Sequence, residues 1–226
     1  MKNREKNESK FREYLPFLTA LLFVVGVGGL GFFLYRTSPP TAQSAGTNTA
    51  SQDMASHHGG GGTTVANNET LNALVGKPLP DIQLSDKDGK VYTAANFKGK
   101  DTVLFFNEGL MCYPACWNQI AAFGSDARFN TSDIQAISVV VDSAKDWKTA
   151  IAKMPQLAKA TTMFDTGASA SKQLGLLTTA SSMHKGSLPG HTYVVIDKEG
   201  IVRYVSDDPN MAIANDSIFN KIAELN

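Results

Sequence analysis

Two continuous apolar runs constrain the fold of this chain more than any other feature. They lie at Thr102–Phe106 (TVLFF) and Ile134–Val141 (IQAISVVV). A short run of β-branched and aromatic residues without polar alternation is typical of a strand that is buried on both faces of a sheet. Between the two runs, Pro114–Phe123 has the composition of a helix with a proline in its first turn. Strands that alternate with helices predict an α/β fold with helices on both faces of the sheet.

Weaker patterns along the chain extend this order of elements. Turn signals at Asp86–Gly89 and Asp197–Gly200 each separate two short strands, and the second pair predicts a closing hairpin that makes the sheet mixed. Ser143 is a candidate cap for the helix that follows it. The further strands are expected at 81–84, 91–92, 161–164, 192–196 and 202–205, and the further helices at 144–154, 169–174 and 218–225.

An apolar segment near the N-terminus predicts a transmembrane helix. Residues 15–35 carry no charge along 21 positions, which as a helix would span about 31 Å, close to the hydrocarbon thickness of a bilayer. Five basic residues precede it, and only Arg36 follows it before Lys77. The positive-inside rule then predicts residues 1–14 as a cytoplasmic tail, with the rest of the chain exported from a cell membrane. The alternative is a cleaved signal peptide, although such peptides have a shorter apolar region.

Residues 37–70 are rich in Ser, Thr, Ala, Gly and Asn and show no periodicity, so we expect a disordered linker there. The pair His57-His58 within it is either a weak metal ligand or part of a low-complexity linker. Residues 71–226 are long enough for one packed domain. The 21 basic and 21 acidic side chains balance, which excludes a globally basic nucleic-acid binder.

The candidate chemistry lies at the two cysteines of the chain, Cys112 and Cys116. Two cysteines exclude both a disulfide-rich scaffold and a zinc site of four thiolates. Both follow the strand at Thr102–Phe106, and reactive groups of open α/β sheets collect beyond the carboxyl ends of strands. The start of a helix also stabilises a thiolate, because its free N–H groups and its dipole favour negative charge.

The Cys-x3-Cys spacing allows several interpretations. On one helix, residues i and i+4 share a face with Cα atoms roughly 6 Å apart, which is inside the window for a disulfide. The same spacing lets two thiolates hold a soft ion such as Cu(I). The alternatives are a structural disulfide, which would close a very small loop and stabilise little, and buried unpaired cysteines.

Other side chains near the cysteines have two interpretations each. His191 comes immediately before a strand that can lie beside the cysteine-bearing strand, where it would tune a thiol, shuttle a proton or ligate a metal, or else be a satisfied turn histidine. Glu108 is either a proton acceptor for Cys112 or a solvated loop carboxylate. We expect His184 in a loop, and Trp117 either shielding the thiols or packing in the core.

Several motifs carry a resemblance to a known family. They are the opening VGKPLPDIQL with DGK and FKGK, the strand VLFF that leads to Cys112, the stretch from Phe164 to Gly175, and the ending HTYVVIDKEGIVRY from His191. Over residues 71–226 the chain resembles the thioredoxin-like redoxins, and more narrowly the alkyl hydroperoxide reductase/thiol-specific antioxidant group, which is peroxiredoxin-like. The resemblance implies a thioredoxin-like fold with a mixed central sheet flanked by helices, here preceded by the predicted transmembrane helix.

The chain departs from that family at the positions that bind peroxide. Peroxiredoxins typically show Pro-x3-Thr-x2-Cys, whereas Gly109 and Tyr113 stand three residues before the two cysteines. His191 stands where the family often has an arginine. Membrane-tethered thioredoxins have a similar layout but use Cys-x2-Cys. The Sco copper-assembly proteins are similar in their anchor, their Cys-x3-Cys and their downstream histidine, but their usual Asp-His pair is absent here.

We therefore predict an antioxidant thiol oxidoreductase, anchored in the membrane, that needs no cofactor. Cys112 would attack a peroxide or a protein disulfide, Cys116 would resolve the intermediate, and His191 would assist. A thiol reductant would restore the pair. The alternative from a different class is a Cu(I) carrier that uses Cys112, Cys116 and His191 as ligands. A third reading is an interaction module that has lost its chemistry and buries unreactive thiols.

Overall fold

The computed structural model describes residues 69–225. The predicted cytoplasmic tail at 1–14, the predicted transmembrane helix at 15–35, and nearly all of the predicted linker, including His57 and His58, lie outside these residues. Within 69–225, none of the helices combines the length and the apolar character that crossing a bilayer requires.

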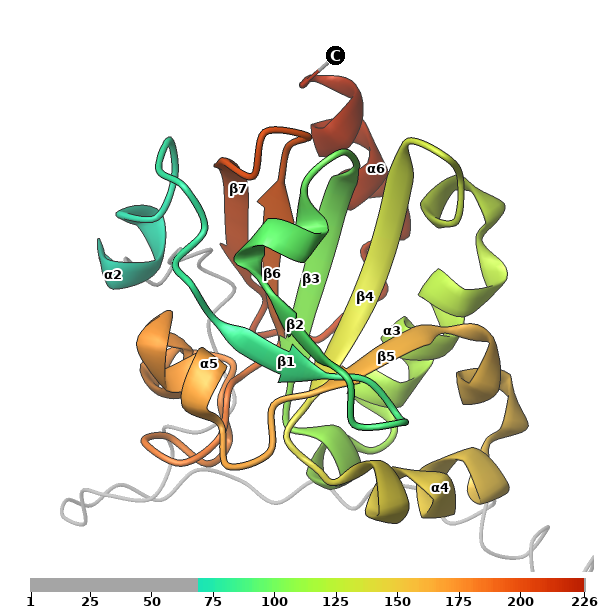
Figure 1. Cartoon of the computed structure of the whole chain (residues 1–226). Coiled ribbons are helices and arrows are strands. Elements are labelled where there is room, and N and C mark those ends of the chain that lie inside the picture. The colour runs from blue at the N-terminus through green and yellow to red at the C-terminus, as the bar shows by residue number, and fades with distance from the viewer. Residues whose placement is uncertain (1–68, 226) are drawn as a thin grey trace, which may run out of the picture. The chain divides into compact units, whose positions relative to one another are not determined.

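The described residues form one mixed sheet in the order β2-β1-β5-β4-β3-β6-β7 (Figure 1). In the middle of the sheet, β3 pairs parallel with β4 and antiparallel with β6. The hairpin of β6 and β7 makes the sheet mixed, as the sequence predicts. The strands are β1 Gln83–Ser85, β2 Val91–Thr93, β3 Asp101–Asn107, β4 Ile134–Val140, β5 Thr161–Phe164, β6 Thr192–Ile196 and β7 Val202–Asp207.

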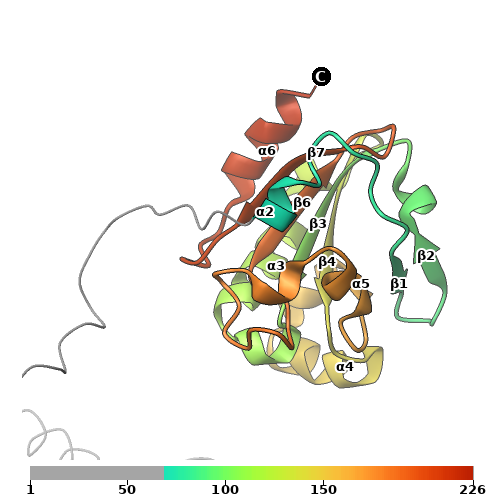
Figure 2. The same cartoon turned by 90° about the vertical axis from the view of Figure 1, so that its left-hand side faces the viewer.

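Helices cover both faces of this sheet (Figures 1 and 2). On one face lie α3 Ala115–Ser125, α4 Ala144–Lys153 and α6 Asn215–Ala223, which bury their apolar side chains in one core cluster. On the other face lie the short helices α2 Glu69–Asn72 and α5 Ser169–Gln173, which belong to a second cluster. The 3-10 turns are η1 Ala94–Phe97, η2 Gly109–Cys112, η3 Ala127–Phe129, η4 Pro155–Lys159 and η5 Leu176–Thr178.

Strand β3 is the centre of the fold. All seven of its residues are buried, which confirms the interpretation of its apolar run as a central strand. Val103 and Phe105 pack into the cluster beneath α3 and α4, and Leu104 and Phe106 pack into the other cluster. Because side chains alternate along a strand, a two-sided core requires apolar residues at successive positions.

Helix α4 begins where the sequence predicts a cap. The Ser143 hydroxyl accepts a hydrogen bond from the backbone N–H of Asp146 at 3.1 Å, which satisfies one of the free donors of the first turn. Trp147 and Ala150 are the buried residues of this helix and face the sheet. The α/β thioredoxin-like architecture predicted for residues 71–226 is thus confirmed in its mixed sheet and in the helices on both faces.

A glycine of α3 sets how closely this helix approaches the segment after α4. A Cβ atom at Gly124 would lie 2.6 Å from the backbone nitrogen of Ala160. Although alanine is the better helix former, we expect Gly124→Ala to lower the free energy of unfolding by about 1–3 kcal/mol, because backbone must move to admit the methyl group. Urea unfolding of the variant measures this. Asn118→Ala, at an exposed position of the same helix, is the matched control and should change stability by less than about 0.5 kcal/mol.

Candidate active site

Cys112 and Cys116 are joined by a disulfide, with Cα atoms 5.3 Å apart. The short distance predicted from their spacing is confirmed, but its expected cause, a shared helix face, is wrong. Cys112 ends turn η2, and Cys116 is the second residue of α3. Pro114 lies between the two elements and follows a cis peptide bond with Tyr113. Since η2 ends at Cys112 and α3 begins at Ala115, the two cysteines lie on two different elements that meet here.

Three side chains hold turn η2 at the carboxyl end of β3. The Asn107 side-chain oxygen accepts from the N–H of Gly109 at 2.9 Å, and an Asp142 carboxylate oxygen accepts from the N–H of Leu110 at 2.9 Å. The Trp117 indole donates to the Gly109 carbonyl oxygen at 3.0 Å. Trp117 is buried in the core, as one of its two interpretations predicts. These bonds fix the backbone that leads to Cys112.

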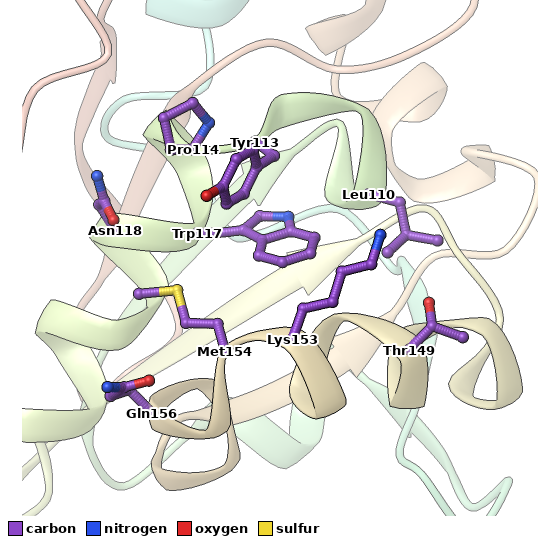
Figure 3. A pocket seen from close by; sticks show the side chains of 9 residues that line it. All are labelled: Leu110, Tyr113, Pro114, Trp117, Asn118, Thr149, Lys153, Met154 and Gln156. Carbon is purple, nitrogen blue, oxygen red and sulfur yellow. The ribbon is translucent and has the colours of Figure 1, made fainter. Parts of the chain in front are cut away.

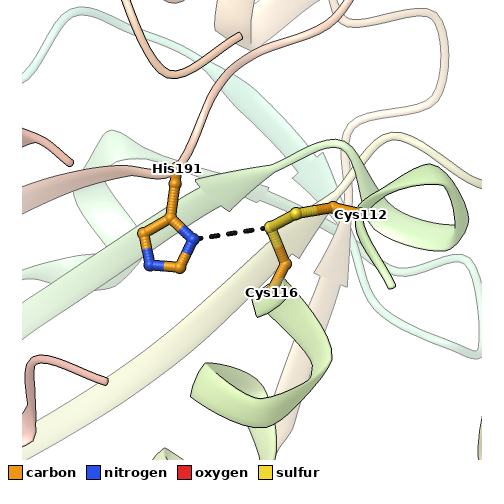
Figure 4. Close-up of side chains that lie close together, drawn as sticks. All are labelled: Cys112, Cys116 and His191. Atoms are coloured by element: carbon orange, nitrogen blue, oxygen red, sulfur yellow. Dashed lines mark hydrogen bonds between the residues drawn. A yellow bond between two sulfur atoms is a disulfide. The ribbon is translucent and has the colours of Figure 1, made fainter. Parts of the chain in front are cut away.

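His191, the residue just before strand β6, lies against the disulfide (Figure 4). Its Nδ1 atom is 3.5 Å from the Cys116 sulfur, and its Nε2 atom is 2.8 Å from the Tyr193 hydroxyl oxygen. The potential ligand atoms of the two cysteines and His191 all lie within 4.8 Å of one another. The structure thus brings together the three predicted site residues, and all three side chains are buried.

Burial sets the charge of His191. Removal from water lowers the pKa of its imidazole to about 4, although the carboxylates of Asp208 and Asp207 act in the opposite direction. At neutral pH the ring is therefore uncharged, with one nitrogen as donor and the other as acceptor. It can exchange a hydrogen bond or a proton with Cys116, but it does not carry a fixed positive charge that would stabilise a thiolate.

Two further residues fix the backbone of His191. The Ser181 hydroxyl accepts from the His191 N–H at 2.6 Å and itself donates to the Asp207 carboxylate. Asp207 also accepts from the Thr192 hydroxyl at 3.2 Å. Position 190 requires a glycine, because a Cβ atom there would lie 2.0 Å from the Ser181 hydroxyl oxygen. The approach of the 181–182 segment therefore holds His191 in place.

Glu108 has a different place from either of its predicted ones. Its carboxylate is buried and accepts from the backbone N–H groups of Met183 and His184 at 2.7 and 3.1 Å. It also contacts the His184 ring at 2.8 Å. The expectation of a solvated loop carboxylate is wrong, and these bonds commit the carboxylate to the loop rather than to Cys112. His184 lies in a loop, as predicted.

Sequence reasoning missed Asp142 and Tyr193, for which it had usable signals. Asp142 is a polar residue just beyond the carboxyl end of β4, the edge where functional groups collect. Tyr193 stands two residues after His191, and alternation along an extended chain puts both side chains on one face. Partial burial raises the pKa of the Asp142 carboxyl.

A cavity of about 610 Å³ opens beside the disulfide loop (Figure 3). It lies between the start of α3 and helix α4, with Trp117 on one side and Lys153 on the other. This volume is in the usual range of small-molecule sites. The lining residues are Leu110, Tyr113, Pro114, Trp117, Asn118, Thr149, Lys153, Met154 and Gln156.

A family model described as Redoxin matches residues 74–222. This chain belongs to the redoxin family. Among curated proteins it is similar to chloroplastic peroxiredoxin Q of Triticum aestivum, with 34% identity over 136 residues that cover 58% of this chain and 57% of the relative. It is also similar to chloroplastic peroxiredoxin Q of Populus jackii, with 31% identity and 58% of each chain covered. The match thus spans less than two thirds of either relative.

Solved structures share the fold at lower identity. A peroxiredoxin-like protein from Aquifex aeolicus superposes with a TM-score of 0.56 and 23% identity, covering 67% of this chain and 87% of that one. AhpC from Mycobacterium tuberculosis superposes with a TM-score of 0.55 and 19% identity, covering 67% and 92%. These likenesses confirm the thioredoxin-like fold.

The similarity to chloroplastic peroxiredoxin Q contradicts the predicted location. We expected a cell-membrane protein with its redoxin domain outside the cytoplasm, whereas the relatives that match the chain are chloroplastic proteins. The expectation relied on hydropathy and on charge asymmetry around residues 15–35, which lie outside the described part. Such patterns report how a segment would orient in a bilayer and carry no information on which compartment receives the protein.

The low pKa of His191 predicts a pH dependence of stability. Between about pH 6.5 and pH 4 the unfolded chain binds a proton at this position and the folded chain does not, so stability falls as the pH falls. We expect His191→Asn to remove this part of the loss, about 2–3 kcal/mol, whatever its effect at pH 7. Urea unfolding at pH 7, 5.5 and 4 measures it. An undiminished loss in the variant would contradict a buried neutral imidazole.

Proposed function

We propose that this chain is a thiol-dependent oxidoreductase of the peroxiredoxin type, which cycles Cys112 and Cys116 between dithiol and disulfide. The observation that carries the proposal is a disulfide at the carboxyl end of the central strand with a buried neutral imidazole against one sulfur. A purely structural disulfide would close a loop too short to stabilise the fold much. The similarity to peroxiredoxin Q supports the same class of reaction.

The two sulfurs have different surroundings, and this difference supports an assignment of their roles. Cys112 is 2% exposed and is flanked by two exposed residues, Met111 at 59% and Tyr113 at 67%. Cys116 is fully buried at the start of α3 and faces His191. We therefore assign Cys112 as the attacking thiolate and Cys116 as the resolving thiol.

With a peroxide, the cycle balances in two steps. The Cys112 thiolate attacks one oxygen, the O–O bond breaks, and the leaving alkoxide or hydroxide takes a proton, which leaves a sulfenic acid on Cys112. Cys116 then attacks the Cys112 sulfur, so that the disulfide forms and water departs. The Cys116 proton passes to the departing hydroxide, and the His191 ring, with Nδ1 3.5 Å from the Cys116 sulfur, lies beside this transfer. Two electrons from an external thiol reductant restore the dithiol.

The oxidant is either a peroxide or a protein disulfide. The protein disulfide is kept as an alternative because the site lacks the threonine and arginine that peroxiredoxins use to bind peroxide oxygens. Gly109 has no side chain to donate, and His191 is directed at Cys116 and Tyr193. With a protein disulfide, Cys112 would form a mixed disulfide, and Cys116 would resolve it.

Substitution of each cysteine tests this assignment. We expect Cys112→Ser to abolish turnover of hydrogen peroxide or of a disulfide substrate. Cys116→Ser should accumulate a Cys112 sulfenate or mixed disulfide and lose at least 100-fold in steady-state rate, on the order of the loss of a positioned catalytic group. Stopped-flow oxidation of the reduced protein, followed by mass spectrometry of the trapped species, measures both. Wild-type activity in both variants would refute the proposal. The remaining interpretation would then be an interaction module without redox chemistry.

The spacing of the donor atoms favours a second candidate function, Cu(I) binding. The candidate ligand atoms of the two cysteines and His191 lie within 4.8 Å of one another in the disulfide form. Reduction of the disulfide would provide two thiolates beside the imidazole, which are ligands that a soft cation prefers. The peroxiredoxins to which this chain is similar give this alternative no support. Anaerobic titration of the reduced protein with Cu(I) decides it, and His191→Ala should weaken binding if three ligands are used. Failure to bind one equivalent removes this candidate.

A further inference from the structure

The Tyr193 hydroxyl is the group that contacts the far side of the His191 ring. The Nε2 atom of His191 lies 2.8 Å from this oxygen, and Nδ1 lies 3.5 Å from the Cys116 sulfur. Both ring nitrogens are thus engaged, one with the phenol and one with the redox pair. Whatever fixes the proton on one nitrogen also decides whether the other nitrogen presents a hydrogen or a lone pair.

Both rings are held in place by aromatic packing. Tyr193 stacks on Phe105 with ring centroids 4.9 Å apart, and His191 meets the same ring edge-on at 4.5 Å. The ring of Phe123, on α3, meets the Tyr193 ring edge-on with centroids 6.3 Å apart. Tyr193 and His191 are 1% and 0% exposed, so bulk water does not reach the hydrogen bond between them. The phenol is therefore a fixed partner of the imidazole.

Hydrogen-bond accounting for the phenol favours one direction of that bond in the oxidised protein. If Nε2 carried the proton and donated to Tyr193, the buried phenol hydrogen would have no acceptor among the described residues. Leaving a buried donor unsatisfied costs about 1–3 kcal/mol. If Tyr193 donates to Nε2 instead, the phenol is satisfied and the ring proton resides on Nδ1. Burial also raises the pKa of Tyr193, so the phenol stays protonated and able to donate.

We propose that Tyr193 is a positioning residue, whose hydroxyl donates to His191 Nε2 and so directs the Nδ1–H at the Cys116 sulfur of the disulfide. The inference rests on the proposed redox function of this pair. It identifies Cys116 as the leaving group when the disulfide is reduced, because the Cys116 sulfur lies 3.5 Å from Nδ1 of the imidazole.

The reductive step then has a defined course. A thiolate of the reductant attacks the Cys112 sulfur, the Cys112–Cys116 bond breaks, and the electron pair remains on Cys116. The new thiolate accepts a hydrogen bond from Nδ1–H, and no proton needs to move in this step. A hydrogen bond to a charged group stabilises it more than one to a neutral group. Since a better leaving group departs faster, Tyr193 accelerates reduction and makes the disulfide more oxidising.

The test compares Tyr193→Phe with Tyr204→Phe. Tyr204 lies on the adjacent strand β7 and is partly buried against the same core, but among the described residues its hydroxyl makes no hydrogen bond to His191 or to either cysteine. Three readouts are used: the long-range proton–nitrogen NMR spectrum of His191 in the oxidised protein, the equilibrium with a reference dithiol such as dithiothreitol, and the rate of reduction by that dithiol.

We expect the wild-type spectrum to show the proton on Nδ1, and Tyr193→Phe to lose that preference. The variant should be reduced about tenfold more slowly, and its equilibrium with dithiothreitol should shift about tenfold toward the disulfide, which corresponds to ~30 mV. Tyr204→Phe should match the wild type in all three readouts.

A wild-type spectrum with the proton on Nε2 overturns the inference, and so do unchanged rates and equilibrium in a folded Tyr193→Phe protein. If that variant does not fold, the wild-type spectrum still decides. Failure of this inference can be distinguished from failure of the proposed function. Full turnover in Cys112→Ser would refute the proposed redox function, whereas an Nε2-protonated ring would refute only the role of Tyr193.

Discussion

The antiparallel register of β6 against β3 is the constraint on which the site depends. Phe106, at the end of β3, pairs with Thr192, at the start of β6. The residue just before β6, His191, therefore lies at the edge of the sheet where β3 releases the chain toward the cysteines. A parallel neighbour would have brought the end of its strand to this edge, so the sense of the closing hairpin places the imidazole beside the disulfide.

Burial then decides what these groups can do. The cysteines belong to the core cluster beneath α3 and α4, and His191 packs on Phe105 of that cluster. The imidazole is uncharged at neutral pH because it is out of water. In such surroundings a hydrogen bond is stronger and an unpaired donor is more costly than in water. The chemistry of the site therefore depends more on which atoms carry protons than on fixed charges. The residues that hydrogen-bond to His191 affect this chemistry more than they would at an exposed site.

The site also shows how polar residues near a reactive centre divide their tasks. Asn107, Asp142 and Trp117 hold the turn that carries Cys112, and Ser181 holds the backbone of His191. Glu108 is buried beside the same turn but is committed to the 183–184 backbone. Each of these groups satisfies a specific backbone donor or acceptor, so the geometry of the two sulfurs depends on a shell that contains no catalytic residue.

The sequence by itself determined the order of strands and helices, the central position of β3, and the three residues that gather at its end. Those features follow from local hydrophobic patterns and from the rule that functional groups collect at the carboxyl edge of a sheet. Tertiary structure alone decided that the Glu108 carboxylate is bound by the distant 183–184 backbone and that the Ser181 hydroxyl holds the backbone of His191. These depend on which segments pack side by side, and contacts between residues far apart in the chain leave no periodic signal in the sequence.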